Sequence, residues 1–98
     1  GGYIPKIQTQ IRYSKEGAVG CVTTDIPYGK MLVPIRIDLP EKSIDTVVSV
    51  TNGMGEFVVP KVDSSTQFQV DPLKMLIAFE RSVSTISHQT KCEKSDDR

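Results

Sequence analysis

MLVPIRIDLP, residues 31–40, is the longest stretch of this chain in which apolar side chains occupy every second position. Successive side chains of a β-strand point to opposite faces of a sheet, so the stretch has one apolar and one largely polar face. It therefore predicts a strand at the centre of a sheet. Pro34 lies within the stretch and has no amide N–H, so its position must face an edge or a bulge of that sheet.

Shorter stretches of the same kind flank residues 31–40 on both sides. They are rich in β-branched residues, and turn residues separate them at intervals of about 8–12 positions, as in antiparallel sandwiches. The predicted fold is therefore all-β, mainly antiparallel, with about seven short strands in a sandwich. Besides the stretch above, the predicted strands are residues 7–13, 18–24 (interrupted by Gly20), 45–51, 56–59, 67–70 and 83–87.

Asn52-Gly53 is the strongest short-range signal in the chain. A two-residue type I′ turn needs positive φ at both central residues, and Asn followed by Gly supplies it at the lowest cost. The dipeptide therefore predicts a β-hairpin. The register that this turn implies has the cross-strand pairs Thr51–Met54, Val50–Gly55 and Val48–Phe57.

Residues 72–84 fit two structures. Apolar side chains recur at every second position from Leu73 to Phe79, as in a strand, yet Asp71 followed by Pro72 is a good start signal for a helix. The β-rich surroundings favour the strand. With a helix, the alternative fold is a small β-barrel with a C-terminal helix, as in pleckstrin-homology domains.

Two cysteines, Cys21 and Cys92, lie far apart in the chain. A small domain benefits from a covalent cross-link, so we predict a disulfide between them and an oxidising environment. The pair resembles the bridge between the two sheets of immunoglobulin domains. The chain has no Trp, and Thr90 stands where those domains carry a Tyr two residues before the second Cys. The resemblance therefore implies an immunoglobulin-like β-sandwich and transfers no functional residue.

PIRIDLP, residues 34–40, is similar to a segment near the last domain of alphavirus fusion glycoproteins. The similarity covers few residues, and the chain lacks the cysteine pattern of that family. We carry no functional residue over from it. A viral structural or glycoprotein domain nevertheless fits the class of protein that the other features indicate.

The chain has 98 residues, the size of one domain, and we predict a single β-sandwich domain over residues 1–98 with a flexible tail at 93–98. Lys plus Arg and Asp plus Glu each number 12, so the formal net charge is zero. A nucleic-acid binder needs a basic stripe, so nucleic acid is not an expected partner. No apolar run approaches the roughly 18 residues that indicate a membrane span, so none is predicted.

The chain offers little for catalysis. His88 is the only histidine, and no Asp or Glu lies near it in the sequence. Ser87 beside it points to the opposite face in a strand, so it cannot pair with His88 as a nucleophile would need. The carboxylates are scattered and fit a solvated surface. We predict no catalytic residue, no metal site and no cofactor, and we expect His88→Ala to leave the fold intact.

Binding remains as the expected role. Tyr28 and Met54 lie at predicted loop tips, where recognition residues concentrate, and Tyr13 is a further candidate anchor because Tyr and Met are enriched in interfaces. The sequence predicts a non-enzymatic protein-interaction or structural module with a protein partner, secreted or surface-exposed. The alternative is a cytoplasmic, adaptor-type binding domain of the pleckstrin-homology class. A small hydrolase is a distant third hypothesis.

Overall fold

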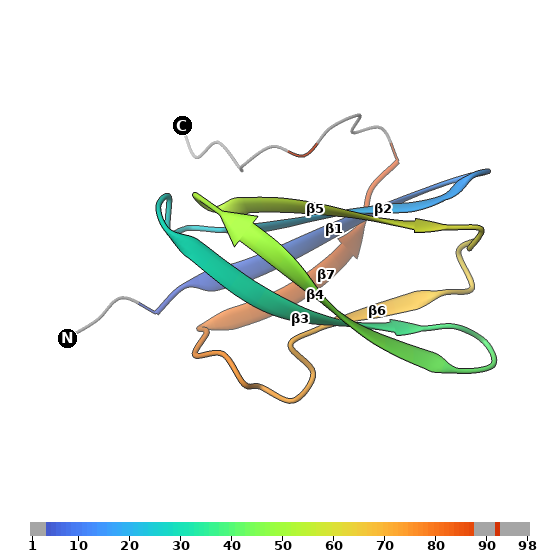
Figure 1. Cartoon of the computed structure of the whole chain (residues 1–98). Helices are drawn as coiled ribbons and strands as arrows, with labels where there is room; N and C mark the ends of the chain where they lie inside the picture. Colours follow the sequence, from blue (N-terminus) through green and yellow to red (C-terminus); the bar gives the residue numbers. More distant parts are fainter. Residues whose placement is uncertain (1–3, 88–91, 93–98) are drawn as a thin grey trace.

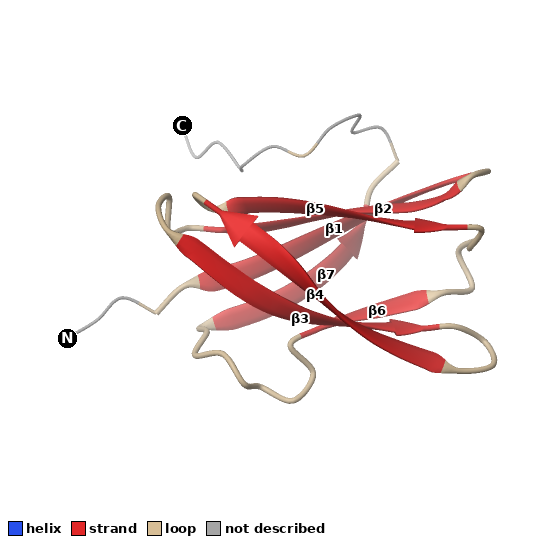
Figure 2. Cartoon of the chain, in the orientation of Figure 1, coloured by secondary structure: helices blue, strands red, loops and turns tan. Residues whose placement is uncertain are grey.

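The computed structural model of the chain describes residues 4–87 and 92. Those residues form seven strands and no helix (Figures 1 and 2). The all-β fold predicted from the alternating stretches is therefore confirmed. The strands are β1 (Lys6–Ser14), β2 (Gly17–Thr24), β3 (Lys30–Asp38), β4 (Ser43–Thr51), β5 (Met54–Pro60), β6 (Gln67–Val70) and β7 (Glu80–Thr85).

One hydrogen-bonded sheet contains all seven strands, in the order β6-β3-β4-β5-β2-β1-β7. Neighbouring strands run antiparallel except β1 and β7, which are parallel. The sheet folds over on itself, so that β3, β4 and β6 lie across β1, β2 and β7 (Figure 1). The two end strands β6 and β7 contact each other, which makes the sandwich nearly a closed barrel.

Strand β3 occupies the stretch from which the fold was predicted. It pairs with β4 along its whole length and with β6 over its last four residues. Its apolar face is buried, since Val33, Ile35 and Ile37 are at most 5% exposed. This confirms the predicted strand, but not its place at the centre of the sheet, because β3 lies next to the end strand β6. The core that it joins consists of Ile7, Ile11, Ala18, Val22, Val33, Ile35, Ile37, Val48, Val50, Phe68 and Val70.

Pro34 lies where the ladder between β3 and β6 ends. The last pair of that ladder is Ile35 with Val70, and the Pro34 carbonyl oxygen accepts the next hydrogen bond, at 2.7 Å, from the N–H of Asp71. The N and C=O of one strand residue point to the same side, so the missing N–H faces the point where β6 stops. The expectation that this proline must face an edge is thus confirmed.

Truncating the apolar face of β3 is expected to destabilise the fold. Ile35→Ala and Ile37→Ala should each lower the free energy of unfolding by about 2–5 kcal/mol, because they remove buried methyl groups and leave a cavity. Leu32→Ala is the matched control, since Leu32 belongs to the same strand but is 56% exposed. Chemical denaturation measures all three. Losses below about 1 kcal/mol at both isoleucines would contradict the assignment of the core.

The Asn52-Gly53 hairpin forms, but its two strands separate at once. Both residues have positive φ, 54° and 89°, and Thr51 pairs with Met54 as predicted. The predicted pairs Val50–Gly55 and Val48–Phe57 are wrong, because β5 leaves β4 after one pair and joins β2. Gly55 permits this departure, since a Cβ there would lie 2.3 Å from the carbonyl oxygen of Ser49.

Gly20 leaves room for an aromatic ring and does not interrupt β2. A Cβ at this position would lie 2.1 Å from the ring of Phe57, so only glycine fits beneath that ring. The Phe57 ring also lies 5.8 Å from the ring of Phe68, measured between centroids. Phe57 therefore connects β2 to β6 across the interior.

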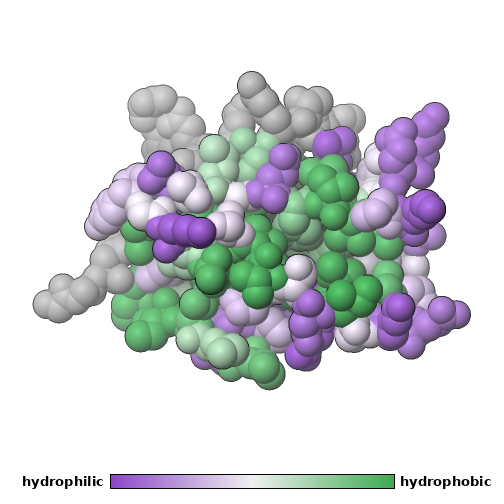
Figure 3. Space-filling view, viewed as in Figure 1, coloured by the Kyte–Doolittle hydropathy of each residue, from purple (hydrophilic) through white to green (hydrophobic). Residues whose placement is uncertain are grey.

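Residues 72–79 are neither strand nor helix. β7 begins only at Glu80, and the chain before it crosses as an irregular loop. Both the strand favoured for this segment and the helix are therefore wrong, and with them the barrel closed by a C-terminal helix. Leu73, Met75, Ile77 and Phe79 are exposed, and Figure 3 shows apolar side chains along the lower edge of the molecule, over this loop. The side chains between them, Leu76 and Ala78, are partly buried against the core.

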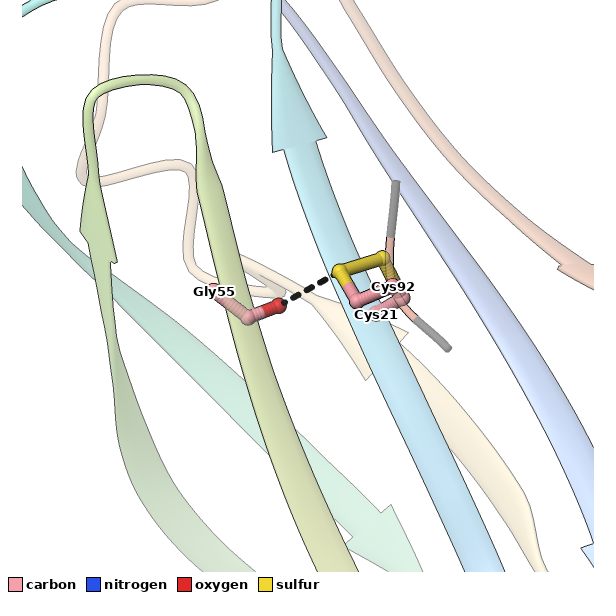
Figure 4. The surroundings of a disulfide bond; sticks show 3 residues. All are labelled: Cys21, Gly55 and Cys92. Atoms are coloured by element: carbon pink, nitrogen blue, oxygen red, sulfur yellow. Dashed lines mark hydrogen bonds between the residues drawn. A yellow bond between two sulfur atoms is a disulfide. The ribbon is translucent and has the colours of Figure 1, made fainter. Parts of the chain in front are cut away.

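The predicted disulfide joins Cys21 of β2 to Cys92, with 5.3 Å between their Cα atoms. Cys21 alternates with the core residue Val22, so it lies on the outer face of β2, and the Cys92 Sγ lies 3.5 Å from the carbonyl oxygen of Gly55 in β5 (Figure 4). The bridge thus fastens Cys92 to the outside of the sheet. In placement it differs from the inter-sheet bridge of immunoglobulin domains. The predicted tail, residues 93–98, lies outside the described residues.

Candidate interaction surface

The apolar loop (residues 72–79) connects β6 to β7 and carries the most exposed large apolar side chains of the described residues. Leu73, Met75, Ile77 and Phe79 are each between 69% and 79% exposed. Isolated apolar residues are common on protein surfaces, but several on one short segment mark an interaction site. The apolar loop is therefore the candidate interaction surface of this chain.

A buried carboxylate holds the backbone of the apolar loop in place. Asp71 directly follows β6, has a φ of 45°, and is 1% exposed. Its Oδ1 accepts a hydrogen bond from the N–H of Met75 and its Oδ2 one from the N–H of Leu76, both at 2.9 Å. The carbonyl oxygen of Asp71 also accepts a bond from the N–H of Lys74, at 3.0 Å. The first half of the loop is thus wrapped around one side chain.

Arg81 completes this arrangement from β7. Its Nε donates to Oδ2 of Asp71 at 2.9 Å, and its terminal nitrogen donates to the carbonyl oxygen of Leu76. Burial alone would raise the pKa of Asp71, but the N–H of Leu76, the guanidinium of Arg81 and the N–H of Met75 together hold it below its ordinary value. The Asp71 carboxylate is therefore ionised at neutral pH and satisfied on both oxygens.

The far end of the apolar loop is attached to the start of β1. The N–H of Phe79 donates to the carbonyl oxygen of Pro5 at 2.7 Å, and the Lys6 ammonium lies 5.8 Å from the centre of the Phe79 ring. The N–H of Lys6 donates in turn to Asp25 in the loop before β3, at 3.0 Å. The end of the apolar loop and the loop before β3 are therefore both hydrogen-bonded to the beginning of β1.

A groove lies between the apolar loop and the outer face of β3 and β4. Pro34 and Val47 face each other across the two strands and form its floor, and Leu73 and Met75 form its wall. Next to this floor, Arg36 and Asp45 make an exposed ion pair at 2.8 Å, which marks a polar rim. The groove has a volume of about 350 Å³. An apolar side chain from another molecule could enter it.

The residues predicted as binding anchors fall in different places. Tyr28 is 69% exposed in the loop before β3, and Met54 is partly exposed beside the hairpin turn at the same end. Tyr13 is half-buried: its hydroxyl donates to the carbonyl oxygen of Thr66 at 2.5 Å and its ring packs against Phe68. Tyr13 therefore serves the packing of the interior. His88 lies outside the described residues.

Sequence reasoning missed the side chains of the apolar loop because their alternation resembled a half-buried strand. The signal that distinguishes an exposed loop from a half-buried strand is the pair of charged residues that flank residues 72–79, Asp71 and Arg81. A carboxylate at a tight turn often binds the backbone N–H groups that follow it. Such bonds compete with pairing to a neighbouring strand.

Comparison of the chain with protein-family models, curated proteins and solved structures gives no match. Within residues 4–87 and 92, no cluster of His, Cys, Asp and Glu side chains could hold a metal ion. The same residues include no helix that is long and apolar enough to cross a membrane. The function is therefore inferred from the surface of the chain itself.

Proposed function

We propose that this chain is a non-enzymatic interaction or structural module that binds a protein partner through the apolar loop. The observation that carries this proposal is a braced backbone that holds four large apolar side chains in water. Exposed apolar surface has an unfavourable hydration free energy, and burial against a partner recovers roughly 1.5–3 kcal/mol for each large side chain. A partner with an apolar groove or face fits this loop.

The bracing distinguishes a binding surface from a loosely packed loop. Ordering a loop on binding costs free energy, and a loop already held in one conformation avoids most of that cost. Asp71 fixes the first half of the apolar loop and Pro5 accepts a bond from its last residue. Tyr28, which is 69% exposed in the loop before β3, is a separate aromatic anchor.

The proposal extends to a secreted or surface location, and a viral structural or glycoprotein domain lies within that class. The Cys21–Cys92 disulfide supports it, since disulfides persist in oxidising compartments. The alternative of a cytoplasmic adaptor depended on a barrel with a C-terminal helix, and the described residues contain no helix.

Site-specific photo-cross-linking tests the proposed function. A photoreactive side chain at Ile77 in the apolar loop should attach the chain to a partner protein in extracts of its native source. The same group at Val58, which is exposed on β5, is the matched control and should capture no such partner. Equal labelling from both positions, or none from Ile77, would exclude the apolar loop as the binding surface.

A further inference from the structure

We propose that the partner of the apolar loop is a second copy of this chain, with the loop of each copy seated in the groove of the other. This inference rests on the proposed function and names its partner. The two features that a twofold interface needs, a protruding apolar segment and an apolar recess, lie next to each other on one surface. A twofold interface uses the same patch on both subunits, so such a patch must complement itself.

The patch contains enough apolar side chains for the centre of an interface. Leu32 and Val47 on the outer face of β3 and β4 are 56% and 57% exposed, and they continue the surface of the apolar loop across the groove. A standard interface buries about 800 Å² on each partner around a few apolar anchors with a polar rim. The accessible surface of the chain is 6569 Å², so such an interface would cover roughly an eighth of it.

The charge of the chain does not oppose association with its own copy. The formal net charge is zero and the isoelectric point is about 6.8, so two copies do not repel each other near neutral pH. The charges on the patch are also mixed in sign: Lys74 lies within the apolar loop, and the exposed Asp45 carboxylate lies at the rim of the groove. In the proposed twofold arrangement, we expect Lys74 of one copy to lie near the Arg36–Asp45 ion pair of the other.

An open sheet edge beside the groove argues for a protein rather than a lipid surface. β6 pairs only with residues 35–38, so no strand covers the other edge of β3 at residues 30–33 within the described chain. The N–H and C=O of Leu32 point to this edge, as the C=O of Pro34 does, because the two residues are two positions apart. A protein partner can hydrogen-bond these groups, whereas hydrocarbon cannot.

Sedimentation and NMR of the purified chain test this inference. The chain should dimerise as its concentration rises, with concentration-dependent amide shifts confined to residues 30–33, 45–47, 71 and 73–79. Met75→Lys should raise the dimer dissociation constant at least about tenfold, because it places a charge against an apolar groove. Val58→Lys on β5 is the control, since Val58 is 66% exposed and Met75 72%, and it should leave the dissociation constant unchanged. Melting curves of both variants should match that of the parent.

If the chain remains monomeric at millimolar concentration, the partner is not a second copy. Concentration-dependent amide shifts elsewhere on the surface would also contradict this inference. Cross-linking from Ile77 to a different protein would then leave the proposed function standing, so the two failures are distinguishable. Flotation with phosphatidylcholine vesicles tests whether the apolar loop binds a lipid surface instead. Binding to vesicles by the monomer, lost in Met75→Lys, would replace the second copy with a lipid surface.

Discussion

Asp71→Ala is expected to lower the free energy of unfolding by about 3–5 kcal/mol, the range seen when one partner of a buried ion pair is removed. The substitution leaves two backbone N–H groups of the apolar loop and the Arg81 guanidinium without their acceptor. Each unsatisfied donor that stays buried costs about 1–3 kcal/mol. Chemical denaturation of the variant and the parent protein measures the difference.

Asp45→Ala is the matched control for this prediction. Asp45 also forms an ion pair with an arginine at 2.8 Å, but its side chain is 70% exposed, whereas that of Asp71 is fully buried. Exposed pairs contribute about 0–1 kcal/mol, so Asp45→Ala should hardly change the stability. Equal losses from the two variants would show that Asp71 does not brace the apolar loop.

The same carboxylate should make stability depend on pH. The pKa of Asp71 is lowered in the folded protein, so its ionised form favours folding. That contribution is fully present above the unfolded-state pKa of about 3.9 and is lost as the pH falls through the lowered folded value. Asp38 and Asp63 have lowered pKa values too, so the parent should lose stability in acid. The Asp71→Asn variant should lose less unfolding free energy than the parent protein over the same pH range.

Replacing Cys21 and Cys92 together with alanine is expected to cost about 4 kcal/mol of unfolding free energy. The two residues are 71 positions apart, and in the chain-entropy model a bridge that closes so long a loop mainly restricts the unfolded chain. The bridge lies on the outer face of β2, so its removal should leave the packing of Val22 and its core neighbours unchanged. Denaturation of the oxidised parent and the double variant gives the difference.

Reducing the parent protein is the control for the double variant. If the bridge acts through the unfolded chain, the reduced parent and the double variant should lose similar stability. NMR spectra of the folded forms should also agree for core residues such as Ile35 and Val33. A much larger loss in the variant, or altered core spectra, would mean that the cysteine side chains matter for packing as well.

The strands were predictable where local pattern and tertiary environment agree. In β3 each apolar residue of the alternating stretch has a core to face, so Val33 and Ile35 are buried as the pattern predicts. The Asn52-Gly53 turn was predictable because its positive φ values depend on two residues alone. The pairs beyond Thr51–Met54 were not predictable, because β5 leaves its hairpin partner to join a strand far away in the sequence.

The amino-acid sequence by itself determined the strand content, the turn at residues 52–53 and the two cysteines available for a bridge, because each depends on neighbouring residues or on composition. Only the tertiary structure decided which apolar stretches face inward. Residues 73–79 alternate much as β3 does, yet their large side chains Leu73, Met75, Ile77 and Phe79 face solvent, and only Leu76 and Ala78 pack against the core. The reason is that Asp71 accepts the backbone N–H groups of Met75 and Leu76 and that Arg81 fixes this carboxylate. The candidate interaction surface therefore arises from a contact between two strand ends that no local pattern specifies.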